Sequence, residues 1–139
     1  MTTNPIWGRA AIIVARLIFA GVFTIAMAFK FMDINATAGA ISMIGLPMAL
    51  PLAWLAAFFE LGLVLAFLTG AFFREATLAA TAYVLFLGFS FHGPDRWAAN
   101  PMEFGFFIDH FTFVAGLLFA AVHGPGNALV LRPKTRRKI

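Results

Sequence analysis

The stretch from Leu50 to Gly70 limits the possible folds of this chain more than any other feature. It is almost wholly apolar, and it has about 20 residues, the length of an α-helix that crosses a lipid bilayer. Its one charged residue, Glu60, lies near the middle. A carboxylate at that depth is costly unless it faces protein or water, stays protonated or finds a partner. The sequence therefore predicts a membrane helix and an intramembrane partner for Glu60.

The composition extends this prediction to the whole chain. Of the 139 residues, 62% are hydrophobic and only 12% are charged. A soluble domain of this size could not bury so much apolar surface, so we predict an all-α integral membrane protein. The chain has no cysteine, which excludes disulfides, thiol redox chemistry and cysteine-ligated iron–sulfur centres.

The apolar runs predict a four-helix membrane bundle that forms a single domain over residues 1–139. We expect the spans at about residues 10–31, 50–70, 76–92 and 103–122. The segment between the first two spans is too short, and too broken by Pro47 and Pro51, to cross the bilayer again. We expect it to form an interfacial or re-entrant segment.

An even number of spans places both termini on one side of the membrane. Arg9, Arg74 and the five basic residues of the tail, residues 127–139, fall on that side, whereas only Lys30 and Arg96 fall on the other. The positive-inside rule therefore predicts that both termini are cytoplasmic. The tail is short and follows a span directly, so contact with anionic lipid headgroups explains its charge better than nucleic-acid binding does.

Two charges are expected to meet inside the bundle. Arg16 lies about 9 Å and Glu60 about 15 Å from the cytoplasmic face, at 1.5 Å per helical residue. Because the first two spans are consecutive, we predict an Arg16–Glu60 ion pair. The pair is either a structural contact that sets the helix register, or Glu60 carries a proton or anchors a ligand.

A second polar group is expected in the outer half, where His92 ends span three and where Asp109 and His110 lie in span four. His110, Phe113 and Leu117 share one face, which is typical of core packing. Two sharper interpretations stay open. One is a metal or haem site that uses His92 and His110, although the spacing does not demand it. The other is a pocket for a quinone or similar lipophilic ring, in which an imidazole donates to a carbonyl and a carboxylate manages the proton.

The order and spacing of several short motifs resemble the DoxX family of small four-helix bacterial membrane proteins. The resemblance covers roughly Ala10 to Leu131, and its residues are Arg16, Gly21, Lys30, Gly45-Leu46-Pro47, Glu60-Leu61-Gly62, Gly70, Arg74, His92, Asn100 and Gly124-Pro125-Gly126. The chain departs from the family in two places. Many relatives have a basic residue, often followed by Asn, where this chain has Asp109-His110, and relatives often have Ser-Leu-Asp where it has Asn127-Ala128-Leu129.

The resemblance implies a bacterial inner-membrane protein with a redox-related role. The family takes its name from a subunit associated with a thiosulfate:quinone oxidoreductase, and some members are linked to membrane oxidoreductase complexes that handle oxidative stress. Arg16, Glu60 and Arg74 match recurring positions, but no catalytic residue is assigned. Three functions stay open: an accessory subunit that binds a quinone or a partner oxidoreductase, a non-enzymatic scaffold or assembly factor, and a small-molecule permease that acts as a homo-oligomer.

Overall fold

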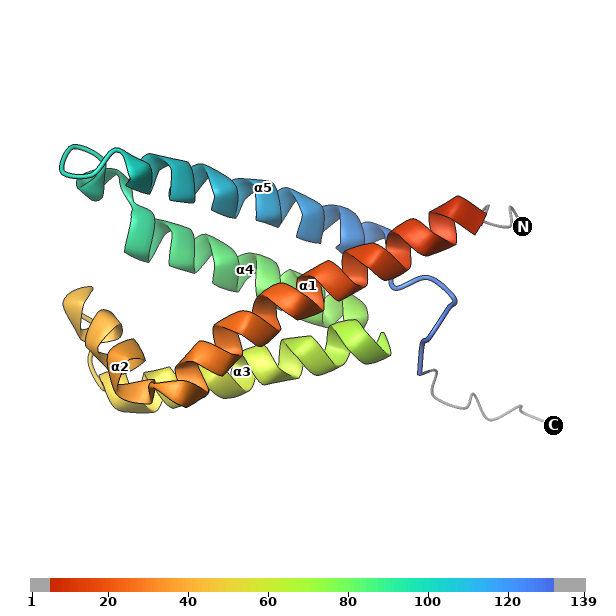
Figure 1. Ribbon diagram of the computed structural model, residues 1–139, viewed down its shortest axis with the longest axis horizontal. Helices are drawn as coiled ribbons and strands as arrows, with labels where there is room; N and C mark the ends of the chain where they lie inside the picture. The colour runs from red at the N-terminus through yellow and green to blue at the C-terminus, as the bar shows by residue number, and fades with distance from the viewer. Residues whose placement is uncertain (1–5, 132–139) are drawn as a thin grey trace.

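The computed structural model describes residues 6–131 (Figure 1). Its elements are α1 (Ile6–Met32), α2 (Ile34–Met43), α3 (Ala49–Thr69), α4 (Phe73–His92), the 3-10 turn η1 (Pro94–Arg96) and α5 (Met102–His123). No strand occurs in this part of the chain. Four helical segments, namely α1, α3, α4 with η1, and α5, are long and apolar enough to cross a membrane. The predicted all-α membrane bundle is therefore confirmed.

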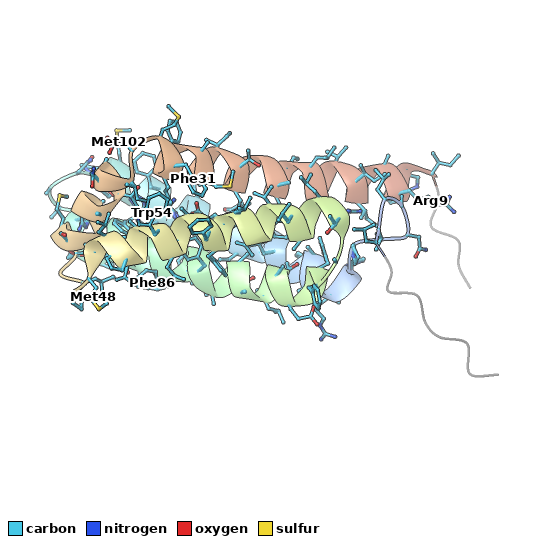
Figure 2. The ribbon with its side chains drawn as sticks, turned by 90° about the horizontal axis from the view of Figure 1, so that it is seen from below. Arg9, Phe31, Met48, Trp54, Phe86 and Met102 are labelled. Atoms are coloured by element: carbon cyan, nitrogen blue, oxygen red, sulfur yellow. The ribbon has the colours of Figure 1, made fainter. Side chains whose placement is uncertain are left out.

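The long helices pack as two pairs, α1 with α3 and α4 with α5, and α2 packs against α3 (Figure 1). The described ends of the chain and the turn between α3 and α4 lie at one end of the bundle, which we call the terminal end. Figure 2 places Arg9 there and Met48, Trp54 and Met102 at the opposite end. Helix α2 and η1 also lie at this opposite end.

The segment between the first two spans forms the short helix α2. It begins after Asp33, whose carboxylate accepts a hydrogen bond from Ala36 N at 2.9 Å and so caps the helix N-terminus. Gly45, at φ +79°, lies in the turn that follows α2, and α3 starts at Ala49. The α2 side chain of Ile41 is buried against the bundle, so α2 covers part of the opposite end.

The core is a cluster of aromatic rings between the two helix pairs. Phe67 of α3 is fully buried, and its ring centroid lies 5.5 to 5.8 Å from those of Phe19, Phe23 and Phe73. Many other large apolar side chains point outward from the long helices. In a bilayer, such side chains face lipid rather than water, which agrees with the membrane environment that the composition predicts.

Residues 124–131 fold back over the terminal end. Leu131 N donates a hydrogen bond to Thr69 O at 2.9 Å, next to Gly70 at the C-terminus of α3. Gly70 has φ +70°, and a Cβ atom there would lie only 3.0 Å from the side chain of Val130. Of the basic tail predicted over residues 127–139, positions 132–139 lie outside the described residues.

We expect Gly70→Ala to destabilise the bundle because alanine is strained at positive φ, by about 1–2 kcal/mol, and because its methyl group would press on Val130. Gly62→Ala, on the same helix, is the matched control, since a Cβ atom there would have no neighbouring atom within 4 Å. Thermal unfolding in detergent should give a lower Tm for Gly70→Ala only. Equal Tm values for the two variants would contradict this account.

Candidate functional site

The carboxylate of Glu60 is held between three helices. Glu60 is 1% exposed, and its Oε1 atom accepts a hydrogen bond from the Tyr83 hydroxyl at 2.8 Å and lies 2.9 Å from Lys30 Nζ. We call these residues of α1, α3 and α4 the Lys30–Glu60–Tyr83 cluster. The other oxygen, Glu60 Oε2, is buried and has no hydrogen-bond partner within the described part of the chain.

Lys30 reaches Glu60 because of the direction that side chains take on a helix. The residue lies in the last turn of α1, which the sequence places at the outer end of the span. Helical side chains lean toward the helix N-terminus, so its ammonium extends back toward the middle of the bundle. Nζ also lies 3.4 Å from Ala26 O, one turn earlier. A charge expected at the interface therefore becomes the intramembrane partner.

The predicted Arg16–Glu60 ion pair is wrong. The depth estimate placed the two residues within reach of each other but ignored side-chain direction. The same lean that carries Lys30 toward Glu60 carries the Arg16 guanidinium away from it, toward the end of α3. Arg16 is 4% exposed, and it forms hydrogen bonds to backbone carbonyl groups rather than an ion pair.

All five N–H groups of Arg16 find acceptors. Nε donates to Phe67 O at 2.9 Å, and Nη2 donates to Leu68 O at 2.7 Å. The remaining acceptors are the carbonyls of Leu129, Ala128 and Pro125, at 2.9, 2.8 and 3.3 Å. Because a guanidinium has five donors, its hydrogen-bonding capacity is used completely. The acceptors on α3 lie in its last turn, where orphan carbonyls and the helix dipole favour a cation.

A cavity of about 390 Å³ lies beside α2, and we call it the α2 cavity. Lys30 and Tyr83 contribute polar atoms to its lining, and most of its other lining side chains are apolar residues of α2, α3 and α4, such as Ile41, Leu55 and Phe86. Figure 2 shows Phe86 in the half of the bundle that also holds Trp54. The arrangement suits a lipophilic ligand that presents a hydrogen-bond acceptor to Lys30, because the one hydroxyl proton of Tyr83 is donated to Glu60.

A second cavity, of about 230 Å³, lies between α1 and α5, and we call it the α1–α5 cavity. Glu60, Asp109 and His110 line it together with apolar side chains of α1, α4 and α5. Leu87 lines both cavities. The structure thus brings three of the sequence-predicted residues to one cavity, although Glu60 comes from a different helix than the two outer ones.

His92 continues this polar group toward the opposite end. Its ring centroid lies 5.1 Å from that of His110, and its Nδ1 atom lies 2.5 Å from Glu103 Oε2. The two imidazoles contact each other at a tilt of 45°, which leaves no room for a haem plane between them. Among residues 6–131, no group of three or more histidine, aspartate or glutamate side chains could hold a metal ion.

The core-packing interpretation of span four is confirmed for part of its predicted face. Leu117 is fully buried, and Phe113 packs against the aromatic core. His110 packs closely on α4, since a Cβ atom on Gly88 would lie 3.1 Å from its Cβ atom. His110 Nδ1 also lies 2.7 Å from Phe106 O. His110 therefore combines a packing contact with a position on the cavity wall.

Sequence reasoning missed Tyr83 and Glu103. Tyr83 carried a usable signal because it is the only tyrosine in a chain with 18 phenylalanines. A phenol inside the bilayer needs a hydrogen-bond partner, and Glu60 is that partner. Glu103 sits at the start of α5, and only the fold of the α4–α5 connection brings it to His92.

The other residues singled out by the sequence have positions at the helix ends. Gly70 ends α3 in the left-handed conformation. Arg74 lies in the first turn of α4 and is exposed at the terminal end. Asn100 Oδ1 accepts a hydrogen bond from Met102 N at 3.1 Å, at the start of α5.

The sequence profile of the DoxX family matches residues 11–93, which is more than half of the chain. The chain belongs to the DoxX family. The matched region contains the complete Lys30–Glu60–Tyr83 cluster, whereas α5, with Asp109 and His110, lies beyond it. No curated protein and no solved structure matches the chain.

We expect a double-mutant cycle to separate the two candidate partners of Glu60 in this DoxX protein. Lys30→Met and Glu60→Gln should each destabilise the fold, because each leaves a buried group without its partner. Their effects should be coupled by about 1 kcal/mol or more, whereas Arg16→Gln and Glu60→Gln should add to within about 0.5 kcal/mol. Thermal or chemical unfolding in detergent measures both cycles, and the reverse pattern would restore the Arg16–Glu60 pair.

Proposed function

We propose that this DoxX protein is an accessory subunit of a membrane oxidoreductase system in the bacterial inner membrane, and that it binds a quinone or similar lipophilic ring in the α2 cavity. One observation carries the proposal. The Lys30–Glu60–Tyr83 cluster places a lysine ammonium with an N–H left over from its contacts to Glu60 and Ala26, and a tyrosine hydroxyl oxygen, at the wall of a cavity whose lining is otherwise almost wholly apolar.

The chemistry of a quinone suits this cavity. The quinone ring is flat and apolar and carries carbonyl acceptors, and Lys30 Nζ has three N–H groups, of which Glu60 and Ala26 take two. Glu60 Oε1 holds the ammonium of Lys30 and the hydroxyl of Tyr83 in place. The volume of about 390 Å³ falls within the range of roughly 300–1,000 Å³ that is typical of small-molecule sites. We place the ligand here rather than around His110, where the sequence placed it, since the cationic donor Lys30 lines this cavity.

We assign the redox centre to a partner. The chain contains no cysteine, so a thiol or iron–sulfur step would need another protein. In the proposed system, a membrane oxidoreductase with its own flavin or haem exchanges electrons with the quinone, and this chain holds the quinone near it. The exposed apolar sides of the long helices provide lateral surfaces for lipid, such a partner or a second copy. The extensive packing of α5 on α4 supports one domain that extends past the matched residues.

We also propose that both termini face the cytoplasm. Arg9 and Arg74 are exposed at the terminal end. At the opposite end, the charge of Lys30 is used by Glu60, which leaves Arg96 as the other basic residue on that side among residues 6–131. The charge asymmetry that sets membrane orientation is therefore greater than the residue count suggests.

Binding of a short-chain ubiquinone analogue to the protein in lipid nanodiscs tests the ligand site. We expect Ala56→Phe, which fills the α2 cavity, to weaken binding at least about tenfold, a loss of about 1.4 kcal/mol. Lys30→Met should also weaken it. Ala66→Phe is the matched control, because Ala66 lies on α3 but lines a different groove. No binding by the unmodified protein, or equal binding by both Ala→Phe variants, would rule the site out.

The absence of native cysteine makes the orientation directly testable. We expect Asn127→Cys to react with a membrane-impermeant maleimide only after the cells are opened, because this position follows α5 at the terminal end. Asp95→Cys, in η1 at the opposite end, should react in intact spheroplasts. The opposite labelling pattern would invert the proposed orientation.

A further inference from the structure

We infer that the α1–α5 cavity is a proton-exchange route between Glu60 and the aqueous surface at the opposite end of the bundle. The route runs from Glu103 and His92 through His110 and Asp109 to Glu60 Oε2. It would supply protons to the ligand site proposed above, and it rests on that proposal only for the identity of the final proton acceptor.

The inner end of the route is a carboxylate oxygen with unused capacity. Glu60 is 1% exposed, and both of its partners, Lys30 and Tyr83, contact Oε1. Oε2 has no hydrogen-bond partner within residues 6–131. A buried polar atom without a partner is costly. Water in the cavity beside it supplies a hydrogen bond and removes this cost, and the volume of about 230 Å³ holds several waters at roughly 30 Å³ each.

The cavity itself shows which groups can exchange protons with Glu60. Of the three cluster residues, only Glu60 lines it, together with Asp109 and His110 from α5. The titratable or charged groups around Glu60 are therefore Lys30 from α1, Tyr83 from α4, and Asp109 and His110 from α5. The remaining lining side chains are apolar. Histidine is suited to transfer near neutral pH because its ordinary pKa lies there.

The outer end of the route reaches solvent through an imidazole pair. The rings of His110 and His92 have centroids 5.1 Å apart, and His92 Nδ1 lies 2.5 Å from Glu103 Oε2. The side chains of His92 and Glu103 are 27% and 20% exposed, and they lie where α4 ends and α5 begins. Together these groups form a sequence of proton carriers from the opposite end to the middle of the bundle.

The transfer involves only protons. Glu103 or His92 takes a proton from water, the proton passes to His110 or Asp109, and it binds to Glu60 Oε2. Each step breaks one O–H or N–H bond and forms another. The reverse sequence returns the proton to the surface, so this route connects Glu60 to the opposite end of the bundle in both directions.

Infrared difference spectroscopy after a rapid pH jump tests the route on the full chain in nanodiscs without quinone. The Glu60 carboxyl band is identified by its loss in Glu60→Gln. After the pH jump, we expect the Glu60 carboxyl band to change at least about tenfold more slowly in the double variant Asp109→Asn/His110→Phe than in the unmodified protein. His92→Phe blocks the same route at another point and should slow the response as well, which keeps the test valid if the double variant does not fold.

Two terminal-end variants, Glu75→Gln and His123→Phe, are the matched controls and should respond at the unmodified rate, because neither residue lines the α1–α5 cavity. Equal rates in the folded route variants and the controls would overturn the inference. A Glu60 band that does not change between about pH 4 and about pH 10, a range that spans the ordinary carboxyl and histidine pKa values, would overturn it too. If the unmodified protein binds no quinone but the Glu60 band still responds to pH at the normal rate, only the proposed function is refuted.

Discussion

The bilayer requires that every charge inside the protein be compensated by the protein itself, and this requirement organises the bundle. Helix α1 carries two cations within the bundle, the buried Arg16 and the partly buried Lys30, and each is compensated in a different way. Arg16 binds five backbone carbonyls, whereas Lys30 binds one carboxylate oxygen. The first solution joins α1 to the end of α3 and to residues 125–129. The second joins α1 to α3 and α4 at the middle of the membrane.

As a result, the two halves of the molecule differ in how many buried hydrogen-bonding groups of residues 6–131 are left without a partner. At the terminal end, the donors of Arg16 are used completely and Leu131 N is bonded to Thr69 O. In the other half, Glu60 has one oxygen with two contacts and one with none. Spare hydrogen-bonding capacity beside a cavity indicates a functional site more strongly than a satisfied ion pair does. For this reason we propose the site in the half that α2 covers.

Hydropathy predicted the membrane bundle because length and apolarity alone determine whether a helix can span the bilayer. The partners of Glu60 were not predictable, because they depend on the direction of side chains and on the relative height of three helices. By its position at the end of the first span, Lys30 resembles an interfacial residue. It reaches Glu60 only because helical side chains point toward the helix N-terminus. Tyr83 looked like one more aromatic residue in an apolar span, although its hydroxyl required a partner.

In the proposed function, the two cavities beside the Lys30–Glu60–Tyr83 cluster have different roles. A lipophilic ligand arrives from the membrane and requires apolar walls, whereas protons arrive from water and require a series of polar groups. The α2 cavity meets the first requirement, and the α1–α5 cavity, with Asp109 and His110, meets the second. Leu87 lies on the wall of both, so the two cavities share a lining side chain. In the proposed function, Oε1 of Glu60 holds the groups of the ligand side and Oε2 accepts the proton, which gives a reason for a carboxylate at a depth where any charge is costly.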